Sequence, residues 1–129
     1  MITIIKTSEY NVKLKATIHS SGRLGFTSDT ADKLNLSEHT YIKFAKDDEI
    51  EGELYLVIVN QEDEDSFKVV KSGNYYYLPT TSMFQSFGFD FKKYNIMFDL
   101  VRMAELDELV SGKVYKLNKR INMRKTKQS

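Results

Sequence analysis

Cationic side chains are concentrated near the end of the sequence. Residues 116 to 129 hold six basic residues and no acid: Lys116, Lys119, Arg120, Arg124, Lys125 and Lys127. Such groups neutralise phosphates and release counterions, so an arm of this kind attracts nucleic acid. We expect residues 121–129 to form a basic C-terminal tail, with Arg120, Arg124 and Lys125 contacting nucleic acid. The alternative is a terminus that only keeps an acidic body in solution.

A second group of basic residues precedes a run of aromatic residues. Tyr75, Tyr76 and Tyr77 follow Lys68 and Lys71 along the chain. Unpaired bases stack on aromatic faces beside cations, and binding of this kind tolerates any base sequence. Alternation along a strand sends one or two of the three rings inward, so core packing is the alternative for this run.

The sequence offers little for catalysis or for metal binding. It has no cysteine, and its two histidines are His19 and His39, without a Ser-His-Asp or metal-ligand spacing around them. Two acidic runs, at residues 47–53 and 62–65, lack the alternation and central glycine of a calcium-binding loop. We therefore expect solvated acidic loops, no metal, no cofactor and no enzymatic activity.

Length and composition favour one globular domain. The chain has 129 residues, of which 41% are apolar and 29% charged, which suffices for one core but not for two. The net charge of +1 combines the basic tail with an acidic body, in which 13 bases face 18 acids. No apolar run approaches the roughly 20 residues of a membrane helix, and no signal peptide is evident. We expect a cytoplasmic protein without membrane contact.

Period-two alternation is the dominant local pattern, and it indicates half-buried strands of an antiparallel sheet. Short helices are expected after Thr27 and after Pro79, the second ending at Gly88, with a helical turn at 103–110. Residues 53–59 are almost continuously apolar, so we expect a central strand covered on both faces. The other expected strands are 12–18, 24–26, 41–44, 67–71, 75–78, 93–98 and 112–115, with an extra edge strand at 1–7.

The two halves of the chain present the same elements in the same order. Each reads strand, Ser-Gly turn, strand, short helix, strand, strand, at about residues 9–60 and 66–117. Units of that size hold little core alone, so the copies should complete each other in a single domain of residues 1–120. We predict a β-rich α+β fold built of antiparallel sheets or a small barrel. The alternative is that glycine turns and tyrosine-bearing strands recur in any β-rich domain.

Residues 15–44 carry a family resemblance. Lys15 to Thr27 reads KATIHSSGRLGFT, and the segments ADKLNL at 31–36 and IKF at 42–44 follow. A strand leading into Gly-Arg, a short extended piece, a small helix closing with Leu-x-Leu and a further strand resembles the swapped-hairpin module of AbrB/MazE-type transcription regulators and antitoxins. The second half keeps this order more loosely, with Ser72-Gly73-Asn74 at its turn.

The resemblance implies that two modules interleave their hairpins and bind double-stranded DNA through basic strand and turn residues. In this sequence the matching positions are Lys13, Lys15 and Arg23, with Lys68 and Lys71 in the second half. We therefore expect a non-catalytic nucleic-acid-binding or transcription-regulator-like module, on duplex DNA in preference to single strands. It would be a monomeric pseudo-dimer or a homodimer. The alternative is a protein-interaction or assembly module that meets a protein partner through the acidic loops and edge strands.

Overall fold

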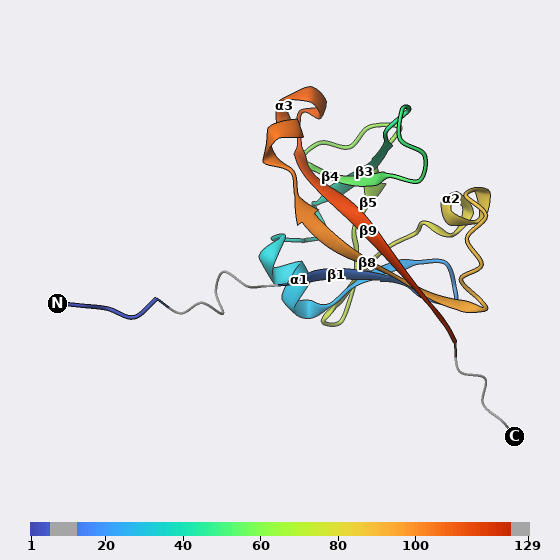
Figure 1. Cartoon of the computed structure of the whole chain (residues 1–129), viewed down its shortest axis with the longest axis horizontal. Coiled ribbons are helices and arrows are strands. Elements are labelled where there is room, and N and C mark those ends of the chain that lie inside the picture. The colour runs from blue at the N-terminus through green and yellow to red at the C-terminus, as the bar shows by residue number, and fades with distance from the viewer. Residues whose placement is uncertain (6–12, 125–129) are drawn as a thin grey trace, which may run out of the picture.

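The computed structural model describes residues 1–5 and 13–124 (Figure 1). These residues form nine strands, three α-helices and one 3-10 helix, which confirms the predicted β-rich class. The elements are β1 (Leu14–Ile18), β2 (Leu24–Phe26), α1 (Ser28–Lys33), β3 (Tyr41–Lys46), β4 (Leu54–Val59), β5 (Phe67–Lys68), β6 (Val70–Ser72), β7 (Tyr75–Leu78), α2 (Thr81–Ser86), β8 (Tyr94–Arg102), η2 (Ala104–Leu106), α3 (Asp107–Val110) and β9 (Lys113–Met123).

All nine strands belong to one sheet, in the order β5-β3-β4-β9-β8-β1-β2-β7-β6, and every pairing is antiparallel. The two edge strands, β5 and β6, are consecutive in the chain and are separated only by Val69. The Val69 N–H donates to the Thr40 carbonyl at 3.0 Å. Because one short segment joins both edges, the sheet rolls into a nearly closed barrel. Of the two predicted architectures, the small barrel is the one observed.

Hairpins from the two halves of the chain alternate around this barrel. The first half contributes β1–β2 and β3–β4, and the second contributes β6–β7 and β8–β9. Between the halves, β1 pairs with β8, β2 with β7, β3 with β5 and β4 with β9. Each hairpin therefore takes its sheet neighbours from the other half of the chain.

The core fills the inside of the barrel with every second side chain of the strands. Ala16 and Ile18 of β1, Leu56 of β4 and Phe98 of β8 are buried there, and Phe84 of α2 packs among them. The outer side of β4 is covered as well, because Val57 lies opposite Val114 in the sheet and both are 2% exposed. Both faces of β4 are therefore covered at this point, as the apolar run predicted.

Local sequence explains where α1 begins and where α2 ends. The Thr27 hydroxyl accepts a hydrogen bond from the Thr30 N–H at 3.2 Å, which caps the start of α1. At the end of α2, Gly88 has a φ of +78° and donates to the Gln85 carbonyl, and Phe89 donates to the Phe84 carbonyl. These two bonds form a Schellman motif, so the predicted glycine cap is confirmed.

Several predicted boundaries differ from the structure. Residues 1–5 lie outside any strand, so this part of the predicted edge strand is wrong, while residues 6–12 lie outside the described residues. The predicted strand 67–71 is two short strands, because it passes from β3 to β7 at Val69. Strand β9 continues to Met123, so the predicted start of the tail at residue 121 falls inside it. None of the described helices is long and apolar enough to cross a membrane.

Candidate nucleic-acid interface

The outer face of β1, β2 and β7 gathers aromatic and cationic side chains. Because Ala16 and Ile18 point into the core, Lys15 and Thr17 point outward, and His19 continues the outward row. By the same alternation Gly25 and Tyr77, which pair directly, lie on the outer face. Four residues meet there and are called the Tyr75 cluster: His19, Arg23, Tyr75 and Tyr77.

The members of the Tyr75 cluster form a continuous row of contacts from His19 to Arg23. The Tyr75 hydroxyl and His19 Nε2 form a hydrogen bond, and the two rings meet edge to face with centroids 5.5 Å apart. Tyr75 and Tyr77 stack at 5.9 Å with an interplanar angle of 27°. The Arg23 guanidinium lies over the Tyr77 ring, 4.8 Å from its centroid, in cation–π geometry. The contacts hold one cation and three rings against a single face of the barrel.

Gly25 makes room for this arrangement. A Cβ at this position would lie 2.6 Å from Tyr75 Cζ and closer still to Tyr75 Oη and His19 Nε2. The Tyr75 and His19 rings therefore lie directly on the backbone of β2. Glycine is required here by the close approach of two side chains, since its φ is not in the left-handed region.

Two shallow pockets flank the Tyr75 ring and share Tyr75 and His19. The Asn74 pocket, of about 360 Å³, is lined by Thr17, His19, Gly25, Phe26, Thr27, Ser28, Asn74 and Tyr75. The Arg23 pocket, of about 330 Å³, is lined by His19, Ser21, Arg23, Ser72, Tyr75 and Tyr77. Hydroxyl and amide groups predominate among their polar side chains, and Arg23 supplies the cation.

Partial burial sets the protonation of the Tyr75 cluster. Burial and, secondarily, the charge of Arg124 lower the pKa of His19 below its ordinary value. Burial raises the pKa of Tyr75, although the Arg23 charge opposes that shift. At neutral pH the imidazole is therefore uncharged and can accept the phenol hydrogen, leaving Arg23 as the cation of the cluster.

Two of the predicted lysines extend this face along β1. Lys13 is exposed just before β1, and Lys15 points outward from it. Lys15 lies opposite Asp99 in the β1–β8 register. The Asp99 carboxylate binds Arg120 of β9, with Nε and Oδ2 2.8 Å apart. Arg120 therefore lies near this face but is already joined to an acid.

Lys68 and Lys71 do not join this face. Phe67 and Val69 point into the barrel, so Lys68 points outward beside Tyr41 of β3, away from β1. Alternation places Lys71 on the inward side of its strand. Its ammonium nitrogen lies 5.9 Å from the centre of the Tyr76 ring. Lys68 of β5 and Lys71 of β6 thus point to opposite sides of the sheet.

Arg124 has a structural position. Its guanidinium donates to the Phe91 carbonyl at 2.9 Å, to Asn95 Oδ1 at 2.5 Å and to the Ile18 carbonyl at 3.2 Å. These bonds tie the end of β9 to β8 and to β1. A side chain engaged in this way has few donors left for a phosphate, and the expected contact of Arg124 with nucleic acid stays a prediction. The expected contact at Lys125 lies outside the described residues.

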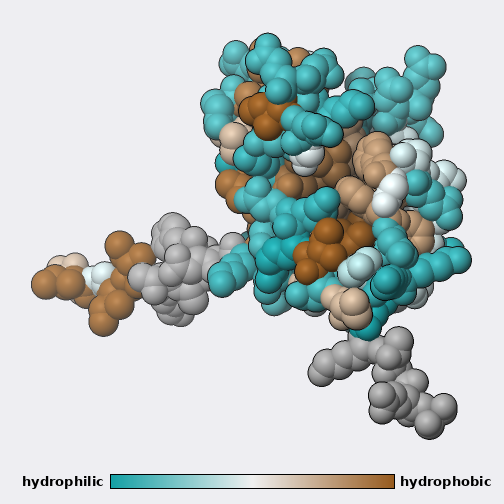
Figure 2. Space-filling view, turned by 45° about the vertical axis from the view of Figure 1, so that its right-hand side comes forward, coloured by the Kyte–Doolittle hydropathy of each residue, from teal (hydrophilic) through white to brown (hydrophobic). Residues whose placement is uncertain are grey.

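The acidic loop between β3 and β4 borders a separate hollow, which we call the Phe87 groove. It has a volume of about 720 Å³ and is lined by Lys46, Asp47, Asp48, Glu49, Glu51, Gly52, Glu53, Leu54, Phe87 and Phe89. Figure 2 brings the α2 side forward and shows apolar surface in a hollow bordered by hydrophilic side chains. The expected solvated acidic loop therefore also forms one wall of a groove with an aromatic wall opposite. Among the described residues, no cluster of side chains has the arrangement of a metal site.

The sequence contained signals for part of the Tyr75 cluster. Alternation divides the tyrosine run as expected, because Tyr76 packs against the core while Tyr75 and Tyr77 point outward. The roles of His19 and Gly25 were missed, since only the β2–β7 pairing brings them to Tyr75. Comparisons with known proteins found no family model, no curated protein and no solved structure that matches this chain.

Proposed function

We propose that this protein is a non-catalytic nucleic-acid-binding module that uses the outer face of β1, β2 and β7. The observation that carries the proposal is the Tyr75 cluster, in which Arg23 and two stacked tyrosines lie on one face. Lys13 and Lys15 lie on the same face, towards the start of β1. Cations neutralise phosphates, and exposed aromatic faces take bases, so the combination matches both parts of a nucleotide.

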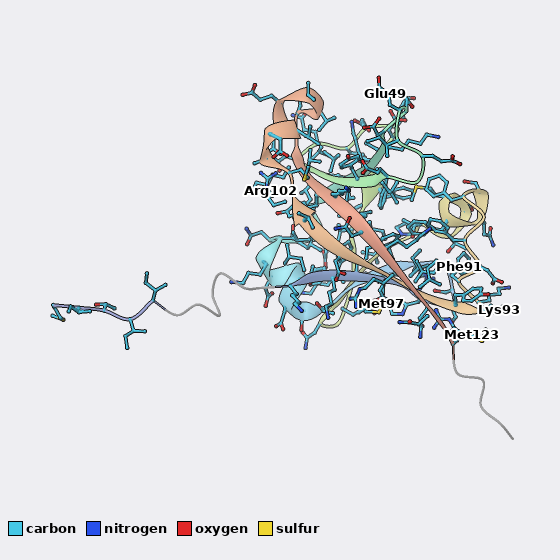
Figure 3. All side chains as sticks on the ribbon, in the orientation of Figure 1. Glu49, Phe91, Lys93, Met97, Arg102 and Met123 are labelled. Atoms are coloured by element: carbon cyan, nitrogen blue, oxygen red, sulfur yellow. The ribbon has the colours of Figure 1, made fainter. Side chains whose placement is uncertain are left out.

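The position of the acidic loop supports this choice of face. Figure 3 labels Glu49 near the top of the molecule, whereas β1 crosses its lower part. A nucleic acid lying along β1 would thus be separated from the Asp47–Glu53 carboxylates, which would otherwise repel it. Asp99, which lies opposite Lys15 in the sheet, forms an ion pair with Arg120.

The alternation of hairpins supports a tandem pair of swapped-hairpin modules. When the two halves are exchanged, β1 replaces the β5–β6 segment, β2 replaces β7, β3 replaces β8 and β4 replaces β9. The cycle of strand neighbours is then unchanged. This is the pattern expected of a duplication in which one chain takes the place of a dimer, as the AbrB/MazE-like resemblance implies. On that reading the first half supplies Arg23, and the second supplies the tyrosines that hold it.

A salt titration tests the proposal. Fluorescence anisotropy with labelled single-stranded DNA, duplex DNA and RNA should show affinity that falls steeply as salt rises. Arg23→Ala and Lys15→Ala should each reduce the slope of log K against log salt by about 0.7–0.9, the effect of one lost phosphate contact. Lys113→Ala, at the opposite end of the barrel beside α3, is the charge-matched control and should leave the slope unchanged.

Three results would contradict the proposal. The first is that no probe binds at low salt. The second is that Arg23→Ala and Lys113→Ala weaken binding equally, which would indicate diffuse attraction. The third is that deletion of residues 125–129 alone abolishes binding, which would reduce the activity to a nonspecific basic arm.

The Phe87 groove supports a second candidate, a site for a basic protein segment. Asp47, Asp48, Glu49 and Glu51 stand on one side of it, and Phe87, which is 41% exposed, stands on the other. A lysine- or arginine-rich peptide could place its aliphatic stems on the aromatic ring and its charges on the carboxylates.

A direct peptide titration separates this candidate from the first. A labelled Lys/Arg-rich peptide should bind the intact protein, and Phe87→Ala and Glu49→Lys should each weaken that binding. Val101→Ala removes a comparably exposed apolar side chain of β8, 44% exposed and outside the lining of the groove, and serves as the control. Equal binding by all variants would exclude the Phe87 groove as the peptide site.

A further inference from the structure

We propose that the Tyr75 cluster binds unpaired bases, so that the ligand of this face is single-stranded nucleic acid. This inference rests on the proposed function and makes it more specific. A duplex keeps its bases stacked and paired and offers a protein mainly their edges and the backbone. A single strand can turn its bases out and lay their faces on aromatic side chains.

The two pockets beside Tyr75 have the form that such bases need. Tyr75 is 36% exposed and lines two hollows, the Asn74 pocket and the Arg23 pocket. With volumes of about 360 and 330 Å³, they are at the lower end of the range for small-molecule sites. Tyr77 stacks on one face of Tyr75, so each pocket offers room for one small planar group beside the exposed part of the ring.

The polar groups of the pockets suit bases of any kind. Ser28 and Asn74 in one pocket and Ser21 and Ser72 in the other carry hydroxyl or amide groups that donate and accept hydrogen bonds. These groups can form hydrogen bonds with the edges of different bases, so we expect little sequence preference. Arg23 lies at the far side of Tyr77 and can reach the phosphate that links two bound nucleotides.

The position of Tyr75 is set before any ligand arrives. Its hydroxyl is held by His19 and its ring stacks on Tyr77. Tyr75 and His19 rest over Gly25 without an intervening side chain. A ring already fixed by its neighbours loses little conformational entropy when a base stacks on it. Gly25 thereby acts as a positioning residue for the site.

The test uses the full chain and two labelled probes, oligo(dT) of ten nucleotides and a twenty-base-pair duplex. Tyr75→Ala should weaken oligo(dT) binding about 5- to 150-fold, the range for one lost base–aromatic stack. Tyr75→Phe keeps the ring and should retain most of the affinity. Gly25→Ala should weaken oligo(dT) binding by about tenfold or more, because its Cβ displaces the Tyr75 and His19 rings.

The outcomes separate the two proposals. If Gly25→Ala lowers the melting temperature appreciably, its effect on binding is not used. The comparison of Tyr75→Ala with Tyr75→Phe then decides whether the aromatic ring binds the bases. If the duplex binds at least as tightly as oligo(dT), and Tyr75→Ala has no effect while Arg23→Ala does, the unpaired-base inference is overturned and the proposed function stands. If neither probe binds at low salt, both fail. Tighter binding of oligo(dT) that depends on the Tyr75 ring supports the inference.

Discussion

The Thr80 hydroxyl joins the two halves of the barrel, and its removal gives a sharp test of the interleaved fold. Thr80, between β7 and α2, is completely buried. It accepts a hydrogen bond from the Leu24 N–H at 3.0 Å and donates one to the Gly22 carbonyl at 3.0 Å. Thr80→Val keeps the shape of the side chain but leaves both backbone groups without their partner.

The expected cost follows from those two bonds. A buried donor or acceptor left unsatisfied costs about 1–3 kcal/mol, and no cavity forms because valine fills the same space. We therefore expect Thr80→Val to lower the free energy of unfolding by about 2 kcal/mol, with a fall in melting temperature of roughly 8 °C. Urea denaturation followed by far-ultraviolet circular dichroism measures the first quantity, and a thermal scan measures the second.

The control is Thr80→Ser, which keeps the hydroxyl and loses only a methyl group. It should cost about 1 kcal/mol, less than the valine variant. If Thr80→Val is within 0.5 kcal/mol of the wild type, or if serine costs as much as valine, the hydroxyl does not join β2 to the second half as described.

Two further changes test other contacts. Arg124→Ala should lower the free energy of unfolding by about 2–3 kcal/mol in urea denaturation, because three hydrogen bonds to one charged group are lost. Arg124→Lys should recover only part of that loss, and an alanine variant that weakens nucleic-acid binding but not stability would contradict the structural position. The Arg102 guanidinium holds the pKa of Asp107 at about 2, against an ordinary value of 3.8. Because the folded carboxylate binds protons less readily than the unfolded one, its stabilising contribution is complete above about pH 4 and is lost as the pH falls towards 2. Asp107→Asn should abolish that part of the acid dependence of the melting temperature, and an unchanged acid profile would refute the assignment.

Features encoded by neighbouring residues were predictable from the sequence. Three such features depend on contacts within a few residues: the alternation of Ala16 and Ile18, the Thr27 cap and the Gly88 cap. The strand, the helix start and the helix end could therefore be predicted. The order of strands and helices followed from the same local patterns. The alternatives of a barrel or of separate sheets both satisfied those patterns, so the sequence left them open.

Contacts between distant parts of the chain were decided only by the tertiary structure. The passage of β5 into β6 at Val69 closes the barrel, and no local pattern distinguishes this from a single strand. Arg124 was expected to contact phosphate, but its guanidinium donates hydrogen bonds to the carbonyls of Phe91 and Ile18 and to the side chain of Asn95. The pairing of β2 with β7 brings Tyr75 to His19. Only this contact explains why residue 25 is glycine, since the two rings lie where a Cβ would be. Alternation determines which side of a strand a residue occupies, whereas the register between distant strands determines what it meets there.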